Sequence, residues 1–442
     1  MNNIGLKKVL IVTDLFHASP RISGLCSYIR EFGWEPVILT TPLGENPEAR
    51  MGPPNDFTEK FRVIEVPYQS FITTLKKLFG FGTGTTGARA EFQKKYGGNT
   101  WKKRLVKKIL MLGVALVVYP DELRAWRHPA IKRGKVLLSK EKFDAILSSS
   151  SPVTSHRVAK ALKEYSGLPW SADFRDLWTQ NHNYPYPGIR KFFERMLEQE
   201  TLRPVNTITT VSESLVQKLQ SLHGTDKQTV SIRNGFDPAA VNDPPAPLTK
   251  KFTITYTGTI YREKQLPEKI FEALSQLIDA ELMARENIEV RFYGASIGWL
   301  DELIDSYNLR GVVKQYGYVP RQESFLKQRE SQILLILGWE DEYELGVFFT
   351  KFYEYLAARR PILATGGTPK EHFRALLDEA NAGRHAVDVS SIKTILFDFY
   401  REYLKTGSVS YHGISSVTNR FSYMEMAKEF TQILDGITAY KR

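Results

Sequence analysis

A short proline-rich stretch divides the chain into two parts that begin with the same pattern. The stretch 243–247 contains three prolines in five residues, a composition typical of a linker. Before it, a buried-strand pattern over 8–13 leads through a loop to a helix pattern over 25–32. After it, a strand pattern over 252–256 leads through a glycine-containing turn to a helix pattern over 267–281. Strand, loop and helix in this order are typical of βαβ units built around a parallel sheet.

The length of the chain supports the same division. A chain of 442 residues exceeds what one hydrophobic core usually organises. We therefore predict an α/β fold of two Rossmann-like, doubly wound domains, residues 1–242 and 249–419, that face a central cleft. Open α/β sheets bind ligands beyond the carboxyl ends of their strands. The loops that follow strands are thus the places where we expect functional residues.

The charge of the chain favours an anionic partner. The formal net charge is +11 and the isoelectric point is near 9.3, which suits nucleic acid, a membrane surface or phosphorylated small molecules. Cys26 is the only cysteine, which excludes a disulfide framework and a multi-cysteine metal site. The apolar run 9–12 near the N-terminus is too short for a signal peptide and reads as a strand. We expect a cytoplasmic protein.

The stretch 348–367 carries the most specific local chemistry. Thr350 is suited to cap a helix that Pro361 ends, and a short buried strand follows. Lys351 and Glu354 are three residues apart and share one helix face near its N-terminus, where free amides and a partial positive charge favour a phosphate. A carboxylate one turn later can accept hydrogen bonds from the two hydroxyls of a ribose. An ordinary surface ion pair is the alternative.

The segment 350–364, TKFYEYLAARRPILA, resembles the donor-binding segment of family 4 glycosyltransferases with the GT-B fold. The resemblance implies that Thr350, Lys351 and Glu354 hold a nucleotide-sugar, with Glu354 as the second glutamate of the family's E-x7-E signature. The first glutamate of that signature would fall at Gly346, and the nearest acid is Glu344.

Further blocks resemble this family and occur in the family's order. They are GLCSYIREFGWEPVILT (24–40), SSSSP (148–152), WSADFRDLW (170–178), RNGFD (233–237), YTGTIYREK (256–264) and YGYVP (316–320). The resemblance implies sugar transfer from a nucleotide-sugar to a hydroxyl acceptor, with retained configuration and without a metal or other cofactor. It also implies a bacterial surface-polysaccharide type of acceptor, saccharide or lipid-linked, and a last helix at about 420–442 that completes the N-terminal domain.

The donor site is expected to include two further loops. Gly258 and Thr259 would let the backbone approach the donor, and one of Arg262 and Lys264 would meet its diphosphate as a catalytic cation beside Lys351. Tyr318 would stack on the nucleotide base. A flexible basic loop is the alternative reading of 257–264.

The N-terminal domain offers polar residues at two predicted strand ends. His17 and Arg21 follow the first strand, where they could face the donor phosphates, the acceptor or only solvent. Asp173, Arg175 and Asp176 follow another strand, and we place Asp173 among the catalytic residues. The same three could instead form a salt-bridge cluster that orders a loop.

The segment 101–118 joins a basic cluster to an apolar run of about ten residues, too short to span a bilayer. It could lie on an anionic membrane surface, at the inner face of the cell membrane, or form a buried helix.

Two other functions remain open. A sugar-nucleotide 2-epimerase would share the two-domain architecture and need no acceptor. A basic nucleic-acid-binding protein would fit the charge, but the basic residues are scattered and form no such motif. We expect no nucleic-acid partner.

Overall fold

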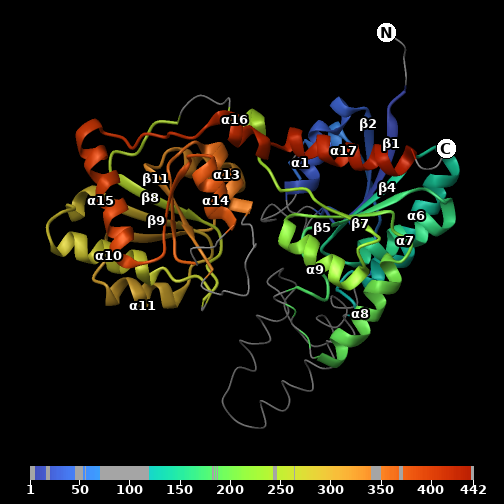
Figure 1. Ribbon diagram of the computed structural model, residues 1–442, viewed down its shortest axis with the longest axis horizontal. Coiled ribbons are helices and arrows are strands. Elements are labelled where there is room, and N and C mark those ends of the chain that lie inside the picture. The colour runs from blue at the N-terminus through green and yellow to red at the C-terminus, as the bar shows by residue number, and fades with distance from the viewer. Residues whose placement is uncertain are drawn as a thin grey trace. The chain divides into compact units, whose positions relative to one another are not determined.

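The computed structural model describes residues 5–15, 20–44, 53–54, 56–69, 119–181, 184, 186, 188–241, 246–262, 264–339, 350–367 and 372–439. The chain forms two compact α/β units (Figure 1). Unit 1 comprises the chain up to Ile232 together with Ala427–Arg442, and unit 2 comprises Arg233–Met426. The division falls just ahead of the proline-rich stretch. That the two domains face one cleft stays a prediction.

Unit 1 is built on a parallel sheet with the order β3-β2-β1-β4-β5-β6-β7 in the described part of the chain. The sheet is doubly wound, because the strand order reverses direction between β1 and β4. The strands are β1 (Lys7–Val12), β2 (Trp34–Thr40), β3 (Arg62–Glu65), β4 (Ala145–Ser150), β5 (Trp170–Phe174), β6 (Thr207–Thr210) and β7 (Gln228–Ser231).

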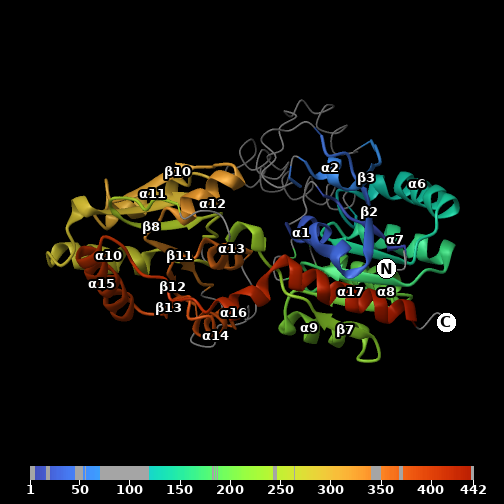
Figure 2. The same ribbon diagram turned by 90° about the horizontal axis from the view of Figure 1, so that it is seen from above.

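Helices cover both faces of this sheet. Leu10, Val12 and Ile146 on one face pack with Leu162 and Leu219 from the helices beside them, and α1 lies with α17 on the other face (Figures 1 and 2). The helices of unit 1 are α1 (Pro20–Tyr28), α2 (Phe57–Lys60), α6 (Arg127–Lys140), α7 (Thr154–Ser166), α8 (Gly188–Leu202) and α9 (Glu213–His223), joined by most of α17 (Tyr423–Ala439).

The last helix is fastened to unit 1 by polar contacts as well as by packing. Asp435 accepts hydrogen bonds from Lys7 Nζ (2.6 Å) and Trp34 Nε1 (3.1 Å). The Phe430 ring lies 4.9 Å from the guanidinium of Arg21, and unit 1 includes Ala427–Arg442.

Strand β3 forms one edge of the unit 1 sheet. Ile64 is the one buried residue of this strand, whereas Val63 is half-buried and Arg62 and Glu65 are exposed. A four-residue edge strand with a single buried residue offers no apolar alternation to recognise.

Unit 2 has the strand order β10-β9-β8-β11-β12-β13, again parallel throughout the described residues. The order reverses between β8 and β11, as in dinucleotide-binding folds. The strands are β8 (Phe252–Thr257), β9 (Ile288–Tyr293), β10 (Val313–Gly317), β11 (Ile333–Leu337), β12 (Ile362–Thr365) and β13 (Gly383–Ala386). The helices are α10 (Glu268–Asp279), α11 (Gly298–Ser306), α12 (Arg321–Arg329), α13 (Thr350–Ala358), α14 (His372–Glu379), α15 (Val389–Thr406) and α16 (Ser415–Thr418).

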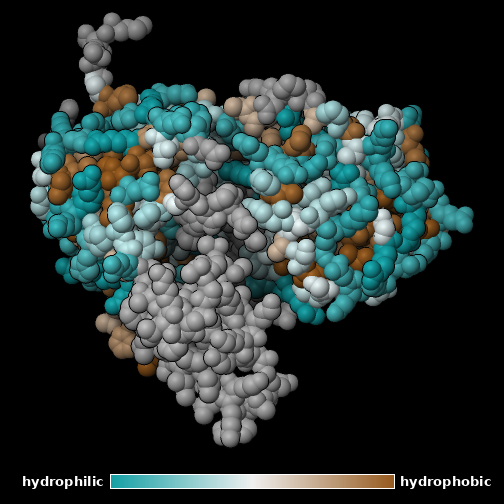
Figure 3. All heavy atoms as spheres, turned by 180° about the vertical axis from the view of Figure 1, so that it is seen from behind, coloured by the Kyte–Doolittle hydropathy of each residue, from teal (hydrophilic) through white to brown (hydrophobic). Residues whose placement is uncertain are grey.

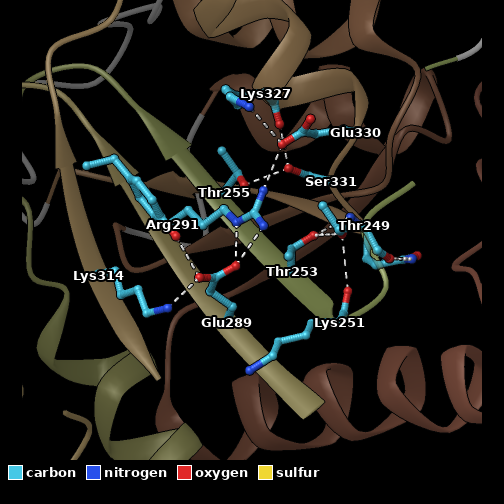
Figure 4. Close-up of polar contacts among 12 residues, drawn as sticks. Thr249, Lys251, Thr253, Thr255, Glu289, Arg291, Lys314, Lys327, Glu330 and Ser331 are labelled. Carbon is cyan, nitrogen blue, oxygen red and sulfur yellow. Dashed lines mark hydrogen bonds and ion pairs between the residues drawn. The ribbon is translucent and has the colours of Figure 1, made fainter. Parts of the chain in front are cut away.

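The two faces of the unit 2 sheet differ in character. Phe252, Ile254 and Tyr256 of β8 point into the apolar core that also receives residues of α10, α11 and α15. The threonines that alternate with them face a polar layer under α12, where Ser331 Oγ donates to Thr255 Oγ1 (2.6 Å). Figure 4 shows this layer. Period-two alternation of Phe, Ile and Tyr with Thr explains why one strand serves both environments.

Candidate functional site

Glycines lie along the carboxyl edge of the unit 2 sheet. In sheet order they end or directly follow five neighbouring strands: Gly317, Gly294, Gly258, Gly338 and Gly366. A Cβ atom on Gly294 would lie 2.3 Å from the carbonyl oxygen of Gly258, closer than any side chain can approach. Gly258 has a φ of +116°, which strongly favours glycine. The edge therefore presents bare backbone at the point where ligands bind in such folds.

Lys351 lies beside this glycine edge. It is the second residue of α13, and its Nζ donates to the hydroxyl of Tyr256 at 2.5 Å. The same Nζ lies 3.8 Å from the centroid of the Tyr256 ring. A Cβ atom on Gly258 would come within 3.3 Å of Lys351 Nζ. The ammonium group is thus held between an aromatic ring and the turn that follows β8.

Burial changes the ionisation of this lysine. It lowers the pKa of Lys351 to about 7, and the negative charge of Glu354 only partly opposes that effect. The hydroxyl of Tyr256 stays protonated, because burial raises its pKa well above the ordinary value. It donates to the carbonyl oxygen of Thr259 at 2.9 Å and is therefore oriented to accept from Lys351. An anion bound here would favour the charged lysine.

Glu354 lies one turn further along α13, as the spacing predicts, but it already has a cationic neighbour. Its Oε1 lies 3.1 Å from the terminal nitrogen of Arg321, the first residue of α12. Arg321 is not among the residues predicted from the sequence. Its place directly after the YGYVP block, at a helix start near a strand end, is the signal that could have found it. Thr350 begins α13, and its side chain lies outside the described atoms.

Arg262 and Lys264 point to different sides of the loop after β8. The Arg262 guanidinium lies 5.6 Å from the Trp299 ring centroid of α11, and Arg262 lines a cavity of about 230 Å³ together with Trp299. Lys264 Nζ lies 4.4 Å from the ring centroid of Trp339, which follows β11. Because β8 and β11 flank the point where the strand order reverses, Lys264 is directed toward that point and Arg262 away from it.

Aromatic residues gather at the end of β10. Tyr318 is 44% exposed and is thus accessible to a planar ligand. The Tyr293 and Tyr316 rings stack at 5.0 Å, and the Tyr316 hydroxyl donates to Glu289 at 2.6 Å. Tyr318 is among the residues predicted from the sequence, whereas Tyr293 and Tyr316 are not.

In unit 1, Arg21 and Asp173 form a buried ion pair. Arg21 donates through Nε (3.2 Å) and a terminal nitrogen (3.0 Å) to the two carboxylate oxygens of Asp173, and both side chains are inaccessible to solvent. The hydroxyls of Ser149 (2.8 Å) and Thr209 (3.0 Å) donate to the same carboxylate. In this arrangement Asp173 positions Arg21 and the ends of three strands.

The other predicted polar residues of unit 1 lie closer to the surface. Arg175 Nε donates to the carbonyl oxygen of Ser150 at 2.8 Å, and its terminal nitrogen donates to that of Ser151. Asp176 is exposed. The carboxylate of Asp173 is buried and that of Asp176 is exposed, although only two residues separate them. His17, the segment 101–118, Glu344 and Gly346 lie outside the described residues.

Nowhere in the described residues do three or more His, Cys, Asp or Glu side chains come together as metal ligands. No helix formed by these residues is both long and apolar enough to cross a membrane.

Comparison with known proteins supports the resemblance seen in the motifs. Residues 99–240, less than half of the chain, match the profile of Glycosyltransferase Family 4. No curated protein sequence matches the chain.

Solved structures show the fold. The chain is similar to a sucrose-phosphate synthase from Thermosynechococcus elongatus, with a TM-score of 0.58 and 14% identity over 98% of this chain and 100% of the other. It is similar to Anabaena HepE in complex with UDP-glucose, with a TM-score of 0.57 and 10% identity over 98% of this chain and 100% of the other. It is also similar to a trehalose 6-phosphate synthase from Burkholderia multivorans, with a TM-score of 0.59 and 11% identity over 99% of this chain and 98% of the other. The chain therefore has the two-unit GT-B fold, and its N-terminal part matches the family that its motifs resemble.

Proposed function

We propose that this protein is a glycosyltransferase that moves a sugar from a nucleotide-sugar to a hydroxyl acceptor. The observation that carries the proposal is the position of Lys351, held by Tyr256 beside Gly258 at the strand-order reversal of unit 2. The match of residues 99–240 to a glycosyltransferase family supports it. So does the similarity to Anabaena HepE, whose structures contain UDP and UDP-glucose.

The residues around the glycine edge suggest how the donor is held. Lys351 and the free amides at the start of α13 would meet the diphosphate, and Lys264 is better directed than Arg262 to add a second positive charge. These charges stabilise the diphosphate as it leaves with the electrons of the broken glycosidic bond. We infer that this stabilisation needs no metal ion or other cofactor.

Two side chains would set the orientation of the nucleoside. Glu354 would accept hydrogen bonds from ribose hydroxyls while its ion pair with Arg321 holds the carboxylate in place. Tyr318, exposed after β10, would stack on the base. Sugar transfer with retained configuration, to a lipid-linked or cell-surface saccharide on the cytoplasmic side of the membrane, is the finer form of this proposal. The motifs that resemble the family and the net charge of +11 support it.

The first test is calorimetric titration of the whole chain with UDP-, GDP-, dTDP- and ADP-sugars. We expect one nucleotide to bind clearly more tightly than the others, and Lys351→Met to weaken that binding by at least about tenfold through loss of one charge–phosphate contact. Lys405→Met is the matched control, because Lys405 is exposed in the last turn of α15. Wild-type affinity of the Lys351→Met variant for every nucleotide-sugar would contradict the proposal.

A further inference from the structure

Gln265 of unit 2 is a polar residue in the interior of the fold. Hydrophilic residues, drawn in teal, cover much of the face in Figure 3, where water satisfies their polar groups. The side chain of Gln265 is only 1% exposed, so its amide needs hydrogen-bond partners within the protein. Those partners show which parts of the unit the side chain holds together.

The amide of Gln265 bridges two segments at the carboxyl edge of the sheet. Its Nε2 donates to the carbonyl oxygen of Leu337, the last residue of β11, at 2.9 Å. Its Oε1 accepts from the backbone amide of Tyr261, in the loop after β8, at 3.0 Å. The side chain thus fastens this loop to the end of the neighbouring strand.

The bridge lies beyond the point where β8 and β11 are paired. Their register ends at Thr255 and Leu334, whereas β11 stays paired with β12 as far as Leu337. The strand order of the sheet also reverses between β8 and β11, and open α/β sheets bind ligands at such a reversal. A side chain therefore joins the two strand ends at the position where we expect the donor.

Lys264 is the residue that this bridge holds in place. The backbone amides of Lys264 and Gln265 both donate to the carbonyl oxygen of Tyr261, at 3.1 and 2.9 Å. The ammonium group of Lys264 lies 4.4 Å from the ring centroid of Trp339, two residues after Leu337. The backbone and the ammonium group of the lysine are thus both attached to the end of β11. A cation held in this way loses little conformational freedom when it meets an anion.

From these contacts we propose that Gln265 is a positioning residue of the donor site, which holds the turn of Lys264 so that the ammonium group meets the donor diphosphate. The inference rests on the proposed function, because it concerns how a nucleotide-sugar is bound. Gln265 acts through Lys264 rather than by its own contact with the donor.

The first test is calorimetric titration of the full chain and its variants with UDP, GDP, dTDP and ADP. For the diphosphate that wild type binds most tightly, we expect Gln265→Met to raise the dissociation constant about fivefold, because the turn loses its anchor to β11. Methionine is unbranched and similar in length, so it fills the same space without an amide.

Gln332 offers a matched control at the opposite end of the same strand. It directly precedes β11 and is fully buried. Its Nε2 donates to the carbonyl oxygens of Thr249 (3.2 Å) and Gly407 (3.3 Å), and its Oε1 accepts from the amide of Val409 at 3.1 Å. Gln332→Met should lower the urea midpoint of unfolding as Gln265→Met does, since both lose buried hydrogen bonds. It should leave the affinity for the diphosphate unchanged.

Double-mutant cycles identify the side chain through which Gln265 acts. Lys264→Met should raise the dissociation constant about tenfold, and adding Gln265→Met should change that value by less than about twofold, since the turn then carries no ammonium group. The Gln265 amide also reaches the hydroxyl of Tyr256, which accepts from Lys351. In a Lys351→Met background the effect of Gln265→Met should remain about fivefold, because Lys264 is still present.

The outcomes separate this inference from the proposed function. Absence of binding of all four diphosphates to wild type would contradict the proposed function and the inference with it. If wild type binds, the inference alone is overturned by any of three results: wild-type affinity of Gln265→Met, an equal loss of affinity in Gln332→Met, or effects of Gln265→Met and Lys264→Met that multiply. Should Gln265→Met not fold, the same comparisons apply to Gln265→Asn, whose amide is one methylene too short to reach both partners and which should weaken binding about threefold.

Discussion

Each unit places a basic side chain near the point where its strand order reverses, but the two side chains have different hydrogen-bond acceptors. In unit 1, Arg21 faces the carboxylate of Asp173, which also accepts hydrogen bonds from two hydroxyls. In unit 2, Lys351 faces the neutral hydroxyl and ring of Tyr256, and burial lowers its pKa to about 7. The first cation is neutralised inside the fold. The second is held where an external anion would improve its environment.

The difference suggests a general criterion for reading such pairs. A buried ion pair whose partners use their hydrogen-bonding capacity within the protein positions the backbone, and removing one partner leaves a charge without compensation. A half-buried cation that donates to a neutral hydroxyl beside a glycine edge has lost hydration, and a bound anion can offset that loss. The following predictions test whether this criterion holds.

The largest expected effect is on the buried pair. Asp173→Ala should lower the free energy of unfolding by about 3–5 kcal/mol, because Arg21 would stay buried without its carboxylate. Denaturant unfolding measures this. The matched control is Glu35→Ala, which removes the partner of Arg30 in a surface pair of similar two-point geometry (2.7 and 2.8 Å) and should cost less than about 1 kcal/mol. Equal losses in the two variants would refute the structural role of Asp173.

Glu289 in unit 2 is a second carboxylate that accepts several hydrogen bonds within the protein. Burial raises the pKa of Glu289, but hydrogen bonds from Tyr316, Lys314 and Arg291 outweigh that effect and lower it to about 2. Figure 4 shows the contacts with Lys314 and Arg291. A lowered carboxyl pKa stabilises the fold above about pH 4.5, and that contribution is lost as the pH falls toward 2. Glu289→Gln should therefore cost about 1–2 kcal/mol at pH 7.

The pH dependence of that cost is the decisive measurement. Urea unfolding of wild type and Glu289→Gln at pH 7, 4 and 2.5 should show a difference that shrinks as the pH falls. A difference that stays constant across this range would mean that the carboxylate charge contributes nothing.

The protonation of Lys351 should determine how many protons the protein takes up when the donor binds. Its pKa of about 7 in the free protein means that above pH 7 the lysine is largely neutral, and a bound diphosphate would draw a proton back onto it. The dissociation constant should then rise by up to about tenfold, or 1.4 kcal/mol, per pH unit above 7. Calorimetry at pH 8 in two buffers of different ionisation enthalpy should show proton uptake. Lys351→Arg should show none, and equal uptake by this variant would assign the proton elsewhere.

The smallest effect is expected from the phenol that orients Lys351. Tyr256→Phe removes the hydroxyl that accepts from Lys351 and donates to the Thr259 carbonyl oxygen but keeps the ring under the ammonium. Donor affinity should fall about three- to tenfold, which corresponds to the net value of one ordinary hydrogen bond, about 0.5–1.5 kcal/mol. The same substitution at Tyr403, whose hydroxyl donates to the Lys250 carbonyl oxygen on the surface, should leave donor affinity unchanged.

The sequence predicts the strands and helices of this protein well, but it predicts poorly which side chains from different elements contact one another. Buried strands such as Ile333–Leu337 and the helix and strand around Pro361 are visible because their apolar content is dense and their ends are marked by proline or glycine. Lys351 and Glu354 could be placed near each other, since three residues of helix fix that distance. The contact between Glu354 and Arg321 could not be predicted, because Arg321 lies on another helix.

The WSADFRDLW block illustrates the same limit. Asp173 and Asp176 look alike in the sequence, but Asp173 is the fourth residue of β5 and faces Ser149 across the sheet, whereas Asp176 lies beyond the strand and is exposed. Only the strand boundary and its register against β4 separate a buried carboxylate from a solvated one.

The place of α17 in the fold has a consequence for how the protein is made. Asp435 and Phe430 cover Trp34 and Arg21, so the first domain to emerge from a ribosome cannot be completed until the last helix has been synthesised. The second domain has all its strands before that moment. Translation order and folding order are therefore reversed for the final step, and the unfinished first domain is the species that chaperones would meet.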